Sequence, residues 1–129
     1  MRTPKVPTIL VVDDEPLMRS MMSRVLEQDG YAVLTAEDGP HALSVFHSHH
    51  RDIDLLISDV RMPGMDGAEL AEELKGEAPE LPVLLMSGFC DPERLRRFEF
   101  IPKPFTVADL MGRVHHLTRR HATHLATAH

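Results

Sequence analysis

Short runs of apolar residues alternate along this chain with longer segments in which apolar residues recur every three or four positions. The short runs are typical of strands buried on both faces, and the longer segments have the spacing of amphipathic helices. Strands are therefore predicted at 8–12, 31–35, 55–57, 82–86 and 99–102. Helices are predicted around the apolar stripes at 17–26, 42–46, 70–74 and 107–117, and a short helix at 91–97 is the fourth in chain order.

Five strand-helix units in sequence predict an α/β fold, in which helices cover both faces of a doubly wound, five-stranded parallel sheet. The 129 residues suit one domain with a substantial core and are too few for two ordinary domains. We therefore expect a single domain over 1–129, with its core at about 7–120 and a frayed, polar tail at 121–129.

Composition narrows the classes of function. A net charge of −6, with no basic stripe to offset it, argues against direct binding to nucleic acid. No run of about 18 apolar residues predicts a membrane span. Cys90 is the only cysteine, which excludes an internal disulfide. Because the N-terminal apolar run is also too short for an export signal, we expect a cytoplasmic location.

Polar residues that could bind a ligand or react follow four of the predicted strands, at the point where each strand ends. Asp13 and Asp14 follow the first strand, and Asp59 follows the third. Ser87 follows the fourth strand, and Lys103 the fifth. In an open parallel sheet, ligands bind in the crevice beyond these strand ends. Carboxylates that meet there repel one another unless a cation joins them, and oxygen ligands favour Mg²⁺. This combination suits phosphoryl transfer.

These residues stand in five motifs whose joint order and spacing are specific. The motifs are VVDDEP at 11–16, AEDG at 36–39, SDVRMPGMDG at 58–67, MSG at 86–88 and KPF at 103–105. In these motifs the chain resembles the receiver domain of two-component response regulators, over nearly its whole length. The resemblance implies a flavodoxin-like (βα)5 fold with the strand order 2-1-3-4-5.

The resemblance also implies a role for each residue at the strand ends. Asp59 would be the phosphoacceptor, and Lys103 would pair with the phosphoryl group. Asp13 and Asp14, with Asp59, would hold Mg²⁺, for which Mn²⁺ is an alternative. The backbone carbonyl of Arg61 would complete the protein ligands of the metal.

A second group of roles concerns signalling. Ser87 and Phe100 would be switch residues that move together after phosphorylation, and the family tends to have a cis peptide bond at Lys103-Pro104. The phosphoryl donor would be a histidine kinase or a histidine phosphotransfer protein. Phosphorylation would alter a surface formed by the fourth helix, fifth strand and fifth helix, and so change binding to a downstream protein or drive dimer formation. The domain would promote its own phosphorylation and dephosphorylation without a separate substrate.

Two features depart from the usual receiver pattern. Only 15 residues separate Ser87 from Lys103, which predicts a fourth helix of about two turns. With Gly88-Phe89, this favours the receivers of hybrid histidine kinases over those of transcription factors, although a stand-alone regulator remains an alternative. Arg61 and Phe89 are bulky residues beside the expected phosphoryl site, so we expect a long-lived phosphoryl group.

Other readings of the same residues stay open. A small phosphohydrolase with an aspartyl-phosphate intermediate would use a similar set, but it would normally carry a second aspartate where Arg61 stands. A receiver fold that binds partners without phosphorylation is another alternative. The histidine pairs and clusters at 47–50 and 121–124 have no Cys or acid at ligand spacing, which argues against a metal site there.

Overall fold

The computed structural model describes residues 6–88, 93 and 96–127. The strands are β1 (Thr8–Val12), β2 (Ala32–Ala36), β3 (Ile53–Asp59), β4 (Val83–Ser87) and β5 (Glu99–Pro102). The helices within these ranges are α1 (Pro16–Gln28), α2 (Gly39–His49), α3 (Gly67–Glu77) and α5 (Val107–Thr127). All strand pairs are parallel, and the sheet has the order β2-β1-β3-β4-β5. The predicted fold class and strand order are therefore confirmed.

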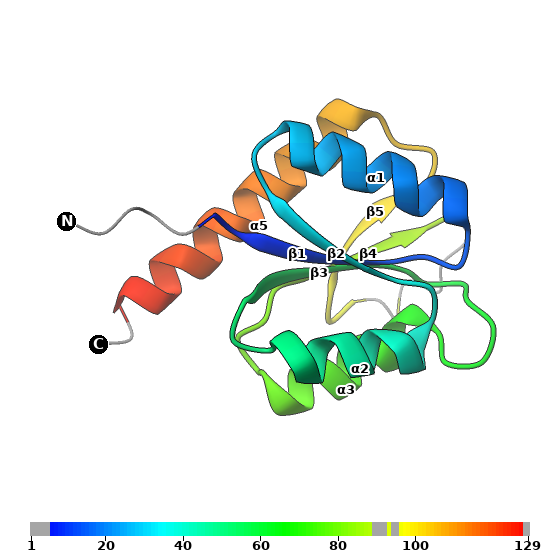
Figure 1. The fold of residues 1–129 in the computed structure, drawn as a ribbon, viewed down its shortest axis with the longest axis horizontal. Coiled ribbons are helices and arrows are strands. Elements are labelled where there is room, and N and C mark those ends of the chain that lie inside the picture. Colours follow the sequence, from blue (N-terminus) through cyan, green and yellow to red (C-terminus); the bar gives the residue numbers. More distant parts are fainter. Residues whose placement is uncertain (1–5, 89–92, 94–95, 128–129) are drawn as a thin grey trace.

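Helices cover the sheet on both sides (Figure 1). Helices α1 and α5 lie on one face, and α2 and α3 lie on the other. Because successive side chains of a strand point to opposite faces, alternate residues of β1 enter different cores. Ile9 and Val11 pack with α1 and α5, whereas Leu10 and Val12 pack with α2 and α3. The continuous apolar run of β1 thus reflects burial on both faces.

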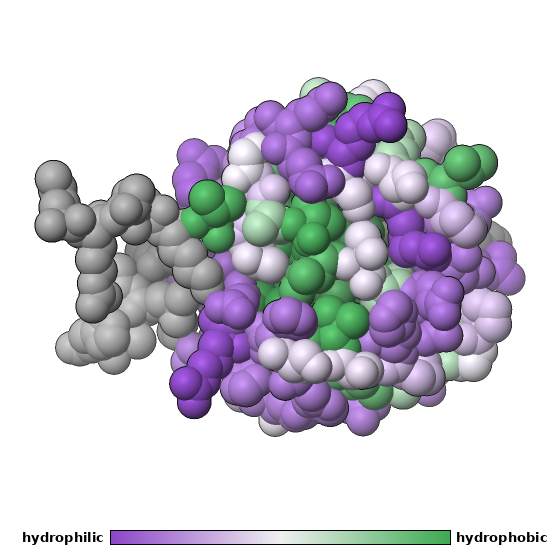
Figure 2. Space-filling view, viewed as in Figure 1, coloured by the Kyte–Doolittle hydropathy of each residue, from purple (hydrophilic) through white to green (hydrophobic). Residues whose placement is uncertain are grey.

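The outer strands are less covered than the central ones. β2 forms one edge of the sheet, and its Val33 and Leu34 are only half-buried. Figure 2 shows apolar surface between the polar sides of α1 and α2, where this edge lies. Within the described ranges, no helix combines the length and the apolar character needed to cross a membrane.

Strands β2 and β4 lie one residue later in the chain than expected, and the boundaries of β3 and α5 differ by more. Strand β3 extends to Asp59 itself, beyond the apolar residues that marked it in the sequence. Helix α5 continues to Thr127, whereas a frayed tail was expected from residue 121. The side chain of His121 is only 11% exposed, and its Nε2 lies 3.7 Å from Asp54 Oδ1 at the start of β3. His121 therefore joins α5 to the amino-terminal end of β3. The expected short fourth helix at 91–97 falls mainly on residues outside the described ranges.

Candidate functional site

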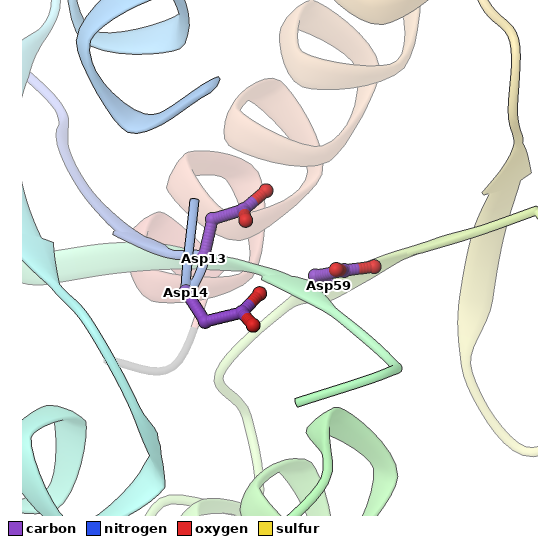
Figure 3. A group of neighbouring side chains, drawn as sticks. All are labelled: Asp13, Asp14 and Asp59. Carbon is purple, nitrogen blue, oxygen red and sulfur yellow. The ribbon is translucent and has the colours of Figure 1, made fainter. Parts of the chain in front are cut away.

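Three carboxylates meet at the carboxyl ends of β1 and β3. Asp13 and Asp14 directly follow β1, and Asp59 is the last residue of β3. β1 and β3 are paired, with Val12 opposite Ser58, so the strands deliver these acids to the same point. One carboxylate oxygen from each aspartate lies within 4.8 Å of the others. Figure 3 shows the three side chains gathered on one side of the strand ends. This geometry suits a hard divalent cation.

Asp13 is the most deeply buried of the three, at 1% exposure. Its Oδ1 accepts a hydrogen bond of 2.9 Å from the Glu15 N–H. Its Oδ2 is buried and has no hydrogen-bond partner among the described residues. Burial raises the pKa of this carboxyl, and the negative charge of Asp59 acts in the same direction. The Glu15 N–H and the charge of Lys103 oppose that rise. A cation bound at Oδ2 would offset the cost of burying the Asp13 charge and would reduce its repulsion with Asp59.

Lys103 supplies a positive charge at the same site. It follows β5, and its backbone N–H donates a 2.8 Å hydrogen bond to the carbonyl of Ser87, which continues the pairing of β4 with β5. Its Nζ lies 3.1 Å from Asp59 Oδ1. The lysine therefore reaches over the end of β4 to the last residue of β3. The Lys103-Pro104 bond is cis, as the family resemblance implied.

Asp59 is also held through its backbone. The buried Ser58 hydroxyl donates a 2.9 Å hydrogen bond to the carbonyl oxygen of Asp59. Gly67, the first residue of α3, lies so close that a Cβ there would be 2.2 Å from the same oxygen. The Gly67 N–H donates to the carbonyl of Val60 at 2.9 Å. The start of α3 therefore packs directly on the backbone of the central aspartate.

Arg61 is exposed in the loop from β3 to α3, two residues after Asp59. At the end of this loop, Asp66 and Glu69 form a capping box for α3, in which the Asp66 carboxylate accepts from the Glu69 N–H at 2.9 Å. Met65 packs against Gly39 at the start of α2, where a Cβ would be 2.8 Å from its side chain. The loop is therefore anchored to both helices on its side of the sheet.

Ser87 and Phe100, the remaining two predicted residues, lie on neighbouring strands at different distances from the strand ends. Ser87 ends β4 and is buried, so it belongs with the strand-end residues. Phe100 lies on β5 opposite Leu85, is half-buried, and packs against the core under α2 and α3. The structure therefore brings together Asp13, Asp14, Asp59, Ser87 and Lys103, and it places Phe100 behind them.

Arg19 contributes to the site although sequence reasoning did not single it out. Its guanidinium donates a 2.7 Å hydrogen bond to the carbonyl oxygen of Asp13. An arginine on the polar side of an amphipathic helix gives no signal of such a bond, because the contact depends on the turn between β1 and α1. In the histidine cluster at 47–50, His47 Nε2 lies 2.9 Å from Glu77 Oε1. Over the described part of the chain, the aspartate cluster is the only group of acids, His and Cys with metal-ligand spacing.

Comparison with known proteins agrees with this geometry. The family model for the response regulator receiver domain matches residues 9–115. The chain belongs to this family. It is 36% identical over 118 residues to response regulator MprA of Mycobacterium tuberculosis. The aligned region covers 87% of this chain and 50% of that protein. This receiver thus spans about half the length of that curated relative. As a receiver of two-component systems, it is a signalling module.

Two solved receivers give the same fold. The receiver domain of the hybrid histidine kinase CckA is 40% identical, with a TM-score of 0.76 over 86% of this chain and 98% of that one. The response regulator TrrA of Thermotoga maritima, solved in complex with Mg²⁺-BeF, is 33% identical, with a TM-score of 0.79 over 87% of this chain and 99% of that one.

Proposed function

We propose that Asp59 accepts a phosphoryl group from the phosphohistidine of a histidine kinase or of a histidine phosphotransfer protein. The observation that carries this proposal is the meeting of Asp13, Asp14 and Asp59 within 4.8 Å, with Lys103 Nζ 3.1 Å from Asp59. Such a site combines a nucleophile, metal ligands and a fixed positive charge, which in-line phosphoryl transfer requires.

The metal would be Mg²⁺, with Mn²⁺ as the alternative. Asp13, Asp14, Asp59 and the backbone carbonyl of Arg61 would hold it. The buried Asp13 Oδ2, without a partner among the described residues, supports this assignment, as does the all-oxygen donor set. When bound, the ion would neutralise charge on the phosphoryl oxygens during transfer. The TrrA receiver, solved with Mg²⁺-BeF, supports the same assignment.

The transfer itself uses residues of this chain. A carboxylate oxygen of Asp59 attacks phosphorus, and the bond between phosphorus and the donor's imidazole nitrogen breaks. Lys103 stabilises the negative charge that spreads over the phosphoryl oxygens. Attack by water on phosphorus later releases inorganic phosphate and restores the Asp59 carboxylate. The domain thus promotes its own phosphorylation and dephosphorylation.

Ser87 and Phe100 would transmit the effect of phosphorylation from the site to a binding surface. Ser87 is buried at the strand-end site, and Phe100 lies behind it, with one face toward the core. Movement of the Ser87 hydroxyl toward the phosphoryl group would draw Phe100 inward and alter the surface of β5, α5 and the expected fourth helix. That surface would bind a downstream protein or a second receiver.

Intact mass after incubation with acetyl phosphate tests the proposal. We expect a gain of one phosphoryl group that requires Mg²⁺ and that is absent in Asp59→Asn. Asp54→Asn is the matched control, because Asp54 lies at the opposite end of the same strand. A mass gain that persists in Asp59→Asn would mean that another residue accepts the phosphoryl group. No gain with any donor or metal would favour a receiver that binds partners without phosphorylation.

A further inference from the structure

We propose that Arg19 is a positioning residue of the acidic site: by bonding the Asp13 carbonyl, it orients the Asp13-Asp14 turn for a divalent cation. The inference rests on the proposed metal site.

Asp13 is held by three segments of the chain. Its backbone N–H donates to the carbonyl of Ala36, at the end of β2, at 3.2 Å. Its Oδ1 accepts from the Glu15 N–H at 2.9 Å, and its carbonyl accepts from the Arg19 guanidinium at 2.7 Å. These bonds leave Oδ2 as the buried oxygen without a partner among the described residues. The contacts therefore direct one carboxylate oxygen toward the site.

The Arg19 bond also acts on Asp14. The carbonyl of Asp13 and the N–H of Asp14 belong to one planar peptide unit, so fixing one fixes the other. Asp14 is exposed, yet one of its carboxylate oxygens lies within 4.8 Å of those of Asp13 and Asp59, as a shared ion would require. A guanidinium that holds this peptide plane reduces the reorganisation needed when the ion binds.

The local helix geometry explains why an arginine at this position can make the bond. Helical side chains point back toward the N-terminus, and Arg19 lies one turn into α1, with its N–H bonded to the carbonyl of Glu15. Glu15 is the N-cap of α1 and makes no side-chain capping bond. The fold of the turn between β1 and α1 thus depends on the side chains of Asp13 and Arg19.

Arg19 acts through geometry more than through its charge. The guanidinium is directed to the carbonyl, on the backbone side of Asp13. An arginine elsewhere on α1 should therefore not replace it, even though it would add the same charge to the protein.

The test is Mg²⁺ titration of the unphosphorylated protein, compared among the parent, Arg19→Met and Arg24→Met. Arg24 is an exposed arginine of the same helix, so both variants lose one positive charge and keep an unbranched side chain. We expect Arg19→Met to bind Mg²⁺ about tenfold more weakly than the parent, a loss typical of residues that orient metal ligands. Arg24→Met should bind as the parent does.

The possible results distinguish failure of the Arg19 role from failure of the proposed metal site. Equal Mg²⁺ affinity in all three proteins, or equal losses in both variants, would overturn the role of Arg19 and leave the metal site standing. A parent that binds no Mg²⁺ would overturn both. A merely structural arginine would lower the free energy of unfolding without changing the affinity of the folded protein. If Arg19→Met does not fold, Arg19→Lys is compared with Arg24→Lys, and equal affinities overturn the proposal.

Discussion

Lys103 and Asp59 are 44 residues apart in the chain, yet Lys103 Nζ lies 3.1 Å from Asp59 Oδ1. β4 lies between their strands, so the contact forms only because the lysine extends past the end of that strand. The side chains are 26% and 11% exposed, respectively. The Lys103 ammonium therefore supplies a partly buried positive charge at the acidic cluster.

A double-mutant cycle should show that this pair stabilises the fold. We expect Lys103→Met to lower the free energy of unfolding by about 1 kcal/mol in metal-free buffer, since it leaves the clustered carboxylates uncompensated. In the Asp59→Asn background the same change should cost less, because one of the repelling charges is gone. Urea unfolding of the four proteins measures the coupling. Equal costs in both backgrounds would mean that the two side chains do not interact.

The raised pKa of Asp13 makes metal-free stability depend on pH. Because burial raises this pKa in the fold, the folded protein binds more protons than the unfolded chain in the range just above the ordinary aspartate pKa. The contribution of Asp13 to stability therefore falls as pH rises through that range and stays unfavourable at neutral pH. Asp13→Asn keeps an oxygen for the Glu15 N–H and removes the charge.

Urea unfolding of the parent and Asp13→Asn across pH 4 to 7, with and without Mg²⁺, measures this effect. We expect the variant to gain stability relative to the parent as pH rises in metal-free buffer. Saturating Mg²⁺ should stabilise the parent and reverse the order. If the difference between the two proteins does not change with pH, the Asp13 charge is not the cause.

Two glycines of α3 provide a matched pair. A Cβ at Gly67 would lie 2.2 Å from the carbonyl oxygen of Asp59, whereas a Cβ at Gly76 would meet nothing within 4 Å. Gly67→Ala should lower the free energy of unfolding by about 3 kcal/mol through overpacking. Gly76→Ala should raise it by about 0.5 kcal/mol, because alanine favours the helix. Thermal or urea unfolding of both variants checks the contrast, and equal effects would contradict the close packing of α3 on Asp59.

Arg61 should govern how long the phosphoryl group lasts. It is exposed two residues beyond Asp59, at the start of the loop to α3. We expect Arg61→Ala to speed dephosphorylation severalfold, because water gains access to the phosphorus atom. Loss of the phosphoryl group can be followed by intact mass after the donor is removed. Phe89, the second bulky residue expected beside the phosphoryl site, lies outside the described residues. An unchanged rate for Arg61→Ala with Phe89→Ala would contradict the steric explanation.

The strands and most helices could be predicted from local patterns because burial on one or both faces imposes a period on the sequence. The five runs of apolar residues and the acids that end two of them were sufficient to predict a parallel sheet with a site at its carboxyl edge. Asp13, Asp14 and Asp59 could be nominated for the same reason: the end of a buried strand is visible in the sequence as the point where apolar residues stop.

The tertiary structure decided the features that depend on segments far apart in the chain. The pairing of β1 with β3 sets the spacing of the carboxylates, and the passage of Lys103 over β4 sets its bond to Asp59. The hydrogen bond from Arg19 to the Asp13 carbonyl follows from the path of the turn before α1, which no local periodicity encodes. Helix α5 likewise continues beyond its apolar stripe, and its His121 lies 3.7 Å from Asp54 of β3, a contact between segments far apart in the chain. Such contacts are set by packing between elements, and packing is a property of the folded chain as a whole.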